Sequence, residues 1–469
     1  MRPEKEINKW SIYHHQKIII MKNIKYLVLS FFLLAAIAGC KKDEEIDNGE
    51  FHPRIFDQGL VFQSPSRIIQ EGQSAAYNRL LFSPAPGEKT KISWTVDGVE
   101  VSTDTAFTFT PTAGGEYEVK VEATYNGQTS ARISKVLVSP ATYTLKSSAF
   151  VVMPYLSENG LAANVDWSIV SHVAFNGARV LPDGGVDFSR GNQNQNIDEI
   201  VARGHLNNTP VILGVTGRLS GVDGWSLYNS VDFGTVISDP VRRAALVTTL
   251  ATYVTNRRLD GIDVMMTDLS NDVFAISSKS AQSVGPFIAE LKAALPANSI
   301  VTATVTANYM HWEYTSLLHA DWINVHAFEN GLNVGPGAPL GQQSPLSFMN
   351  DAATIWVNKG YPKNKLVLGI PAFGLRYNAL DANGNNASWG SYDYIAYKDI
   401  IATSKDPEVH TKEYDATLAK GVYFNGIPLV TQKANYIKTN GFKGAYIWAG
   451  DYDTMDSKSL IKTIYDTIN

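Results

Sequence analysis

The stretch Leu259-Asp-Gly-Ile-Asp-Val-Met-Met-Thr-Asp268 decides the fold of the long C-terminal part of this 469-residue chain. Its core is a short, nearly continuous apolar run, which is typical of a strand buried on both faces of a parallel sheet. Because side chains alternate along a strand, residues 263, 265 and 267 share one face and Asp268 lies on the other. The first face is predicted to point toward a barrel interior and its mouth.

Seven similar runs place this strand in a larger pattern. Helix-like segments such as 240–254 and 281–295 separate several of them. Apolar strands that alternate with helices predict a parallel sheet covered on both faces, and eight of them fit a (β/α)8 TIM barrel over residues 148–469. In such a barrel the functional groups lie at the carboxyl ends of the strands. The other runs are 150–153, 169–175, 210–215, 300–305, 322–326, 366–370 and 444–448.

The sequence of this strand resembles the fourth strand of glycoside hydrolase family 18, whose members include chitinases and endo-β-N-acetylglucosaminidases. That family carries the motif D-G-x-D-x-D-x-E. Here Asp260, Gly261 and Asp263 match it, whereas Met265 stands at the third Asp and Thr267 at the Glu. Segments 173–176, 214–217, 323–329, 368–374 and 444–451 resemble further strands of the family in the same order. The resemblance therefore spans the whole predicted barrel.

The resemblance also implies roles for these positions. In the family the Glu protonates the glycosidic oxygen, and the substrate's own acetamido carbonyl attacks the anomeric carbon. The neighbouring Asp and a Tyr on the sixth strand hold that acetamide. Thr267 has no useful acidity, Met265 has no charge, and Phe328 at the Tyr position has no hydroxyl. The resemblance therefore implies a glycosidase fold with a degenerate catalytic motif.

Three acidic residues are candidates to replace the missing acid. Asp268 has the wrong strand parity and is read as a residue that faces the helices or caps the next turn. Glu329 follows the sixth strand and is read as a contact to a sugar hydroxyl or a loop. Asp263 is expected to be a buried structural carboxylate bonded to strand-end groups such as Thr216.

Aromatic residues indicate a binding site that survives without the acid. Trp448 stands where the family places a Trp beneath the sugar, and Tyr155 is a second candidate platform. Phe328, Glu329 and Asp263 complete the predicted glycan-binding set. The loop residues Trp225, Trp312 and Trp389 are candidates for extending a groove.

Composition and motifs exclude several other functions. A net charge of −5 offers no electrostatic footprint for nucleic acid. The chain lacks H-E-x-x-H, a Cys/His cluster, a Walker A loop and G-x-S-x-G, so no metal or cofactor is expected. The segment Asp381-Ala-Asn-Gly-Asn-Asn386 is interpreted as an Asn-Gly turn in an insertion before the eighth strand, not as a calcium loop.

The N-terminal region indicates export. Residues 1–40 are interpreted as an extension and a signal peptide that ends at Cys40, the only cysteine, in Ile-Ala-Gly-Cys. This segment resembles a bacterial lipobox, which implies lipidation of Cys40, whereas a plain signal peptide is the alternative. The charged linker 41–55 resembles the export signal of Bacteroidetes surface lipoproteins, which implies the outer membrane's outer surface; its periplasmic face is the alternative.

Residues 56–141 show short strands with period-two alternation. Runs 91–96, 106–111, 116–123 and 130–138 are joined by turn signals such as Asp97-Gly98. This pattern predicts a β-sandwich, and it resembles immunoglobulin-like or PKD modules of exported carbohydrate-active proteins. We expect this sandwich to act as a spacer that lifts the next domain off the membrane, with glycan binding as the alternative.

The sequence predicts a surface lipoprotein that binds N-acetylglucosamine-containing β-glycans, such as chitin oligosaccharides or an N-glycan core, without hydrolysing them. Expected partners are the glycan, the membrane through Cys40, and components of an outer-membrane glycan importer. The alternatives are an active divergent chitinase or endo-β-N-acetylglucosaminidase with a non-standard acid, and a structural protein or adhesin with a vestigial pocket.

Overall fold

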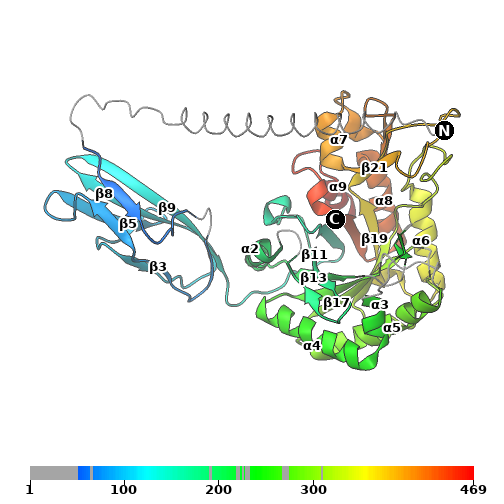
Figure 1. Cartoon of the computed structure of the whole chain (residues 1–469), viewed down its shortest axis with the longest axis horizontal. Helices are drawn as coiled ribbons and strands as arrows, with labels where there is room; N and C mark the ends of the chain where they lie inside the picture. The colour runs from blue at the N-terminus through cyan, green and yellow to red at the C-terminus, as the bar shows by residue number, and fades with distance from the viewer. Residues whose placement is uncertain are drawn as a thin grey trace, which may run out of the picture. The chain divides into compact units, whose positions relative to one another are not determined.

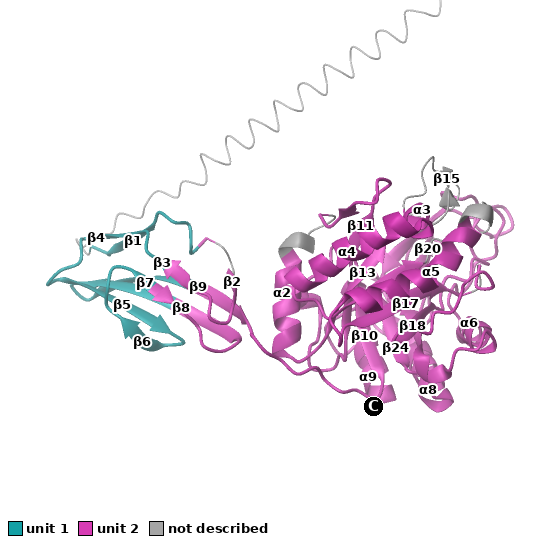
Figure 2. Ribbon diagram, turned by 90° about the horizontal axis from the view of Figure 1, so that it is seen from below, with its two compact units in different colours: residues 1–62, 77–107, 120–133 teal, residues 63–76, 108–119, 134–469 magenta. Residues whose placement is uncertain are grey.

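The computed structural model describes residues 51–63, 67–189, 193–217, 222–223, 226–227, 233–266, 274–307 and 310–469. The predicted lipidation site Cys40, and also Thr267, Asp268 and Trp225, therefore lie outside the described residues. The chain divides into two compact units, residues 1–62, 77–107 and 120–133 and residues 63–76, 108–119 and 134–469, which Figure 2 shows in teal and magenta. Among the described residues, no helix is long and apolar enough to cross a membrane.

The N-terminal region consists of β-strands, with β1 antiparallel to β4, β5 antiparallel to β6 and β2 parallel to β9. Five strands form one sheet in the order β2-β9-β8-β5-β6, and two further pairs are β1 with β4 and β3 with β7. The hairpin turn predicted at Asp97-Gly98 joins β5 to β6, with φ values of 49° and 79°. The bounds are β1 (Arg54–Asp57), β2 (Arg67–Gln70), β3 (Ala75–Tyr77), β4 (Leu80–Ser83), β5 (Thr90–Val96), β6 (Val99–Ser102), β7 (Phe107–Phe109), β8 (Gly115–Tyr125) and β9 (Gln128–Ser139).

Eight parallel strands form a closed barrel in the C-terminal region, as the sequence predicts. They follow the order β10-β24-β19-β18-β17-β16-β13-β11, and pairing of β10 with β11 closes the ring. The short strand β12 (Val186–Asp187) adds to β11 in the antiparallel sense. The barrel strands are β10 (Val151–Leu156), β11 (Val173–Val180), β13 (Val211–Thr216), β16 (Gly261–Met266), β17 (Ile300–Thr306), β18 (Trp322–His326), β19 (Leu366–Pro371) and β24 (Gly444–Trp448).

Helices lie around the outside of this barrel, as Figure 1 shows for α4, α5 and α6. The helix α4 begins with Pro240 after Asp239, whose carboxylate accepts hydrogen bonds from the N–H groups of Val241 and Arg242. The helices are α2 (Gln193–Leu206), α3 (Phe233–Ser238), α4 (Pro240–Asn256), α5 (Phe274–Ala294), α6 (Leu346–Asn358), α7 (Tyr397–Thr403), α8 (Ile427–Asn440) and α9 (Leu460–Ile468).

Alternation along the strands separates two layers of side chains. On β16, Ile262, Val264 and Met266 belong to the outer core between strands and helices. Met265 belongs to a second cluster inside the barrel, and Asp263 shares its face and is fully buried. The parity predicted for positions 263 and 265 is therefore correct, because a strand places alternate residues on opposite faces.

An insertion between β19 and α8 carries a small antiparallel sheet in the order β21-β20-β23-β22. The strands are β20 (Phe373–Tyr377), β21 (Tyr392–Ala396), β22 (Tyr414–Asp415) and β23 (Val422–Phe424). Between β20 and β21, Asp381 accepts hydrogen bonds from the N–H groups of Asn383 and Asn385, and Gly384 has φ +80°. This is the predicted Asn-Gly turn. A separate short hairpin consists of β14 (Val222–Asp223) and β15 (Ser226–Leu227).

One predicted strand boundary is wrong. The run 169–175 is not continuous strand, because β11 begins only at Val173. Before it, the N–H of Ile169 donates to the carbonyl of Asp166 in a turn, and Ser171 donates to Val152 of β10. The apolar residues Ile169 and Val170 pack against the barrel from this turn, so hydrophobicity alone did not mark the boundary.

Candidate functional site

Asp263 lies at the centre of the barrel interior and is held by four donors. Its Oδ1 accepts from Thr302 at 2.6 Å and Asn324 at 3.0 Å, and its Oδ2 accepts from Thr304 at 2.7 Å and Tyr155 at 3.1 Å. A carboxylate has about four acceptor positions, so these donors use its capacity. The expected partner Thr216 is therefore not the one observed, because the donors come from β10, β17 and β18.

Burial sets the ionisation of this carboxylate. Removal from water raises the pKa of Asp263, and the four hydrogen bonds, which lower it, offset that effect only in part. An acid with no free acceptor position and no exposed surface is poorly placed to reach a ligand. The contacts of Asp263 fit a structural role.

Tyr155 does not form the open platform that the sequence suggested. Its side chain is fully buried, and its hydroxyl donates to Asp263. Its ring packs against Trp448, with 5.2 Å between centroids. The pKa of Tyr155 lies well above its usual value because of burial and the nearby Asp263 carboxylate. Tyr155 therefore positions Asp263 and supports Trp448, because its place on the inward face of β10 leaves no exposed ring.

Apolar side chains surround this polar centre on the side of the mouth. Met265 is 6% exposed and Phe328 is 1% exposed, and both belong to the cluster inside the barrel. The ring of Phe328 lies 3.7 Å from that of His326 and 5.9 Å from that of Phe373, measured between centroids. Phe328 is thus a packed residue in this structure and not an exposed glycan contact, since aromatic rings enclose it.

Glu329 and His326 form a polar pair at the carboxyl end of β18. The two side chains are 34% and 21% exposed, and 3.1 Å separates His326 Nε2 from the Glu329 carboxylate. Glu329 has φ +61°, a left-handed conformation that is uncommon outside glycine. Burial opposes ionisation of Glu329, but hydrogen bonds with His326 and with Tyr394 of β21 outweigh it, so its pKa is lowered. Glu329 is therefore an anion near neutral pH.

Trp448 ends β24 with a partly exposed side chain. Its ring leans on the cluster inside the barrel while the other side reaches the surface. Trp312 and Trp389 are 51% and 42% exposed, and Tyr394 is 48% exposed. Exposed aromatic rings of this kind can stack on the apolar faces of sugars.

The first Asp of the motif lies at the opposite end of the strand. Asp260 precedes β16 and accepts hydrogen bonds from Tyr143 at 2.6 Å, His205 at 3.1 Å and the N–H of Val211 at 2.8 Å. Its side chain is nearly buried. These contacts tie the amino-terminal ends of the barrel strands together, so Asp260 belongs to the fold and not to the mouth.

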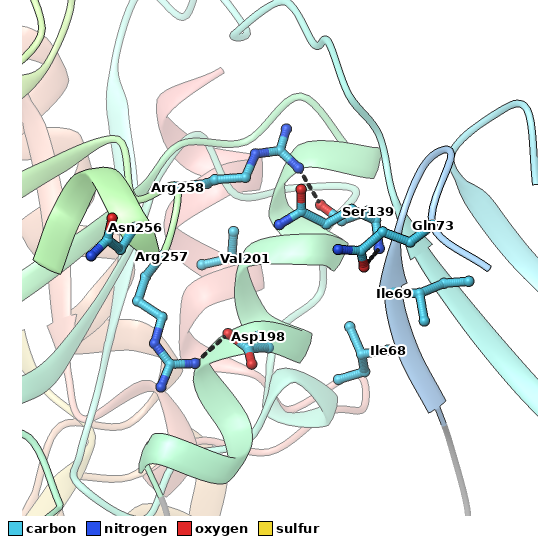
Figure 3. Close-up of a pocket in the computed structure, with 10 residues that line it drawn as sticks. Ile68, Ile69, Gln73, Ser139, Asp198, Val201, Asn256, Arg257 and Arg258 are labelled. Atoms are coloured by element: carbon cyan, nitrogen blue, oxygen red, sulfur yellow. Dashed lines mark hydrogen bonds and ion pairs between the residues drawn. The ribbon is translucent and has the colours of Figure 1, made fainter. Parts of the chain in front are cut away.

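Figure 3 shows a pocket of about 320 Å³ that ten residues of the second unit line. Its barrel residues include Arg257 and Arg258, which precede β16, and Asp198 of α2. Arg257 donates to Asp198 at 2.7 Å, so this ion pair already satisfies one charge in the pocket. Because these residues lie before the strand, the pocket is separate from the mouth.

The site offers no grouping for a metal within the described part of the chain. No three His, Cys, Asp or Glu side chains there come together as possible ligands.

Two inward-facing residues, His326 and Tyr446, were not among the predicted site residues. Their parity is the same as that of Asn324 and Trp448, and this periodicity was the available signal.

Comparison with known proteins agrees with this geometry. The description "Glycosyl hydrolases family 18" matches residues 151–453. "Chitinase 1" of Aphanocladium album is 26% identical over 166 residues, which cover 33% of this chain and 38% of that protein. The chain therefore spans less than half of that relative. "Chitotriosidase-1" of Mus musculus is 23% identical over 353 residues, with 65% of this chain and 73% of that protein covered.

A solved structure shows the same fold. The family 18 chitinase ChiB from the chitin utilization locus of Flavobacterium johnsoniae superimposes with a TM-score of 0.54 at 22% identity. The match covers 69% of this chain and 94% of ChiB. At this identity the likeness establishes the fold alone. The match of the family to residues 151–453, together with the closed eight-stranded barrel, shows that this chain belongs to glycosyl hydrolases family 18.

Proposed function

We propose that this protein binds N-acetylglucosamine-containing β-glycans, such as chitin oligosaccharides or an N-glycan core, at the barrel mouth and does not hydrolyse them. The observation that carries the proposal is on β16. Asp263 has all acceptor positions filled, and the next inward residue toward the mouth is the uncharged Met265. Asp263 has no exposed surface from which to reach a glycosidic oxygen, and Met265 carries no acidic proton.

The aromatic residues at the mouth support binding. Trp448 has a partly exposed ring backed by the buried ring of Tyr155. Glu329, ionised and paired with His326 at the carboxyl end of β18, supplies acceptors for sugar hydroxyls. A firm apolar platform with a polar group at its rim is the usual composition of a sugar site. The chitinase names of its relatives favour N-acetylglucosamine as the sugar.

Hydrolysis with a non-standard acid is the alternative, and Glu329 and Asp268 are the candidates for that acid. The lowered pKa of Glu329 speaks against the first, because a group that has lost its proton at neutral pH is a poor general acid. Asp268 has the wrong strand parity for the mouth. A third alternative is a structural protein or adhesin with a vestigial pocket.

The test is isothermal titration of the full chain in detergent with chitotetraose, followed by mass analysis of the sugar. We expect saturable heat and intact sugar, and Trp448→Ala should weaken binding by about tenfold or more. Cleaved sugar would support the divergent enzyme, and unchanged binding by Trp448→Ala would support the vestigial pocket. Met265→Asp combined with Thr267→Glu should create hydrolysis if only these groups are missing.

The proposal includes the setting of the site. A lipid on Cys40 would hold the protein at the outer membrane, the linker 41–55 would direct it to the cell surface, and residues 56–141 would act as an immunoglobulin-like or PKD-like spacer. Nearby glycan importer components would then receive the bound sugar. The wild type should incorporate radiolabelled palmitate and a Cys40→Ala variant should not, which tests the lipid anchor. Cleavage of the protein by protease added to intact cells tests its exposure at the cell surface.

A further inference from the structure

Glu329 carries a negative charge at the barrel mouth that no lysine or arginine of the described residues pairs with. Its side chain is 34% exposed, and its carboxylate contacts His326 Nε2 at 3.1 Å and the hydroxyl of Tyr394. None of the described groups that bond to it or shift its pKa is a lysine or an arginine, and His326 is charged only when protonated. A partly buried carboxylate in such surroundings attracts a cation from solution, because partial removal from water strengthens the electrostatic interaction.

The cations on β20 and α7 are engaged elsewhere. The Arg376 guanidinium of β20 makes two hydrogen bonds with the Asp393 carboxylate of β21, at 2.8 and 2.7 Å. Asp393 precedes Tyr394 in β21, so the two side chains leave the strand on opposite faces. The Lys398 ammonium of α7 donates to the carbonyl of Asp451 at 2.6 Å. Neither cation is therefore available to the carboxylate at the mouth.

Aromatic rings border this carboxylate. The ring of His326 lies 3.7 Å from that of Phe328, and the ring of Tyr394 meets that of Phe373 edge-on at 5.3 Å, measured between centroids. These contacts hold the two rings in place, while Tyr394 remains 48% exposed. Because ring faces attract organic cations, a carboxylate bordered by aromatic rings is a favourable setting for an ammonium group.

The backbone fixes the position of the carboxylate. Glu329 has φ +61°, a conformation that costs a non-glycine residue free energy. The next residue, Asn330, donates from its N–H to the carbonyl of Gln343 at 2.9 Å and from its side chain to the carbonyl of Gln342 at 3.4 Å. The charge is therefore in place before a ligand arrives, which lowers the free-energy cost of binding.

The surroundings favour an organic ammonium group over a metal ion. Within the described residues no three His, Cys, Asp or Glu side chains come together, so a bare ion would lack ligands there. An ammonium group needs one carboxylate and can use ring faces for the rest of its shell. The same mouth offers Trp448 as a platform for a sugar ring. A sugar that carries an amine satisfies both features.

N-acetylglucosamine becomes such a sugar when its acetyl group is removed, because the amide is then a primary amine that takes up a proton near neutral pH. We infer that the protein prefers partly deacetylated N-acetylglucosamine glycans and that Glu329 binds the ammonium group of a glucosamine unit. The inference rests on the proposed glycan-binding function and names the substrate class of that site. Trp448 holds a sugar ring of the same glycan, and the rings of His326 and Tyr394 border the ammonium group.

The test compares chitotetraose with its four singly deacetylated forms, in which one unit at a time is glucosamine. Each sugar is titrated calorimetrically into the full chain in detergent at about pH 7. We expect at least one deacetylated form to bind about tenfold more tightly than chitotetraose. This advantage should fall to about twofold or less in about 0.5 M salt, because salt screens partly exposed charges.

Two variants show whether the charge of Glu329 causes the preference. Glu329→Gln keeps the size of the side chain and removes its charge, so it should bind all five sugars within about twofold of one another. Asp393→Asn is the matched control, because it removes a negative charge from the opposite face of β21 that Arg376 already neutralises. This variant should keep the advantage of about tenfold.

Equal affinity of the wild type for all five sugars would overturn the inference alone. An advantage that survives in Glu329→Gln or disappears in Asp393→Asn would do the same. The proposed function stands in each of these cases if chitotetraose binds and Trp448→Ala weakens its binding. Binding of none of the five sugars by the wild type would overturn the proposed function as well.

Discussion

Replacing Asp263 with alanine tests whether this carboxylate holds the barrel together. The substitution removes the acceptor for Thr302, Thr304, Tyr155 and Asn324 at once. Asn324 keeps a second acceptor, because it also donates to Thr304 at 3.2 Å. The Thr304 hydroxyl also loses its acceptor but still accepts this bond, whereas the hydroxyls of Tyr155 and Thr302 keep no hydrogen-bond partner within the described residues.

The expected magnitude follows from these two hydroxyls. An unsatisfied buried donor costs about 1 to 3 kcal/mol, so two of them cost about 2 to 6 kcal/mol. Removal of the carboxylate offsets part of this free-energy cost, because burial disfavours its ionised form. We expect Asp263→Ala to lower the free energy of unfolding by about 3 kcal/mol, measured by urea denaturation with tryptophan fluorescence.

The Asp263→Asn variant separates shape from charge. Asn keeps one carbonyl, and threonine hydroxyls can accept from its amide, so the loss should be smaller than with alanine. The folded pKa of Asp263 is above the unfolded value of 3.8, so the wild type loses stability as pH rises from 3.8 through the folded pKa. The difference in free energy of unfolding between the wild type and the Asp263→Asn variant should therefore become smaller at higher pH. Equal stability of wild type and Asp263→Ala would refute the structural role.

Three further predictions concern ionisable groups. Glu329→Gln should weaken chitotetraose binding about tenfold in a titration, since a charge-assisted hydrogen bond is lost; equal affinity would contradict this. Burial, and to a smaller extent the charge of Lys443, lower the pKa of His172 to about 4. The free energy of unfolding of the wild type should therefore fall by up to about 3 kcal/mol as the pH falls from 6.5 to 4. His172→Gln should remove this pH dependence of stability, measured by thermal melting at a series of pH values. Burial raises the pKa of Asp453 to about 6, so the free energy of unfolding should fall by up to about 3 kcal/mol as the pH rises from 4 to 6. Asp453→Asn should abolish this loss of stability with rising pH. An unchanged pH dependence in the variant would exclude Asp453 as its source.

The sequence was sufficient to predict the barrel because the same pattern, an apolar run, recurs for each strand. Each apolar run corresponds to one barrel strand, and alternation placed Asp263 and Met265 on the inward face. Periodicity states which face a residue occupies but not what lies opposite. The partners of Asp263 are distant in sequence, since Thr302 is 39 residues away along the chain and Tyr155 is 108 residues away. Thr216 was therefore a reasonable guess from the adjacent strand, but it was wrong.

The same limit explains the aromatic residues at the site. Tyr155 and Trp448 both face inward, and the sequence treated both as platforms. Burial separates them, since Tyr155 is fully buried and Trp448 is partly exposed, although the two are partners in the strand register. The burial of a side chain depends on the residues packed around it, which a single sequence does not reveal. Tyr446 was missed for this reason, because its hydroxyl is seen to lack a hydrogen-bond partner among the described residues only when its neighbours are placed.

Matches and mismatches to the family motif separate along β16 by depth. Asp260 ties the amino-terminal ends of the strands, and a side chain at Gly261 would collide with the backbone of Ile300. Asp263 gathers four donors in the centre. The first departure comes at Met265, closer to the mouth, where a change of side chain leaves these contacts in place. A chain can therefore retain the barrel through the lower part of this strand while the upper part changes its chemistry, because the contacts that hold the fold and the groups that would perform hydrolysis occupy different layers.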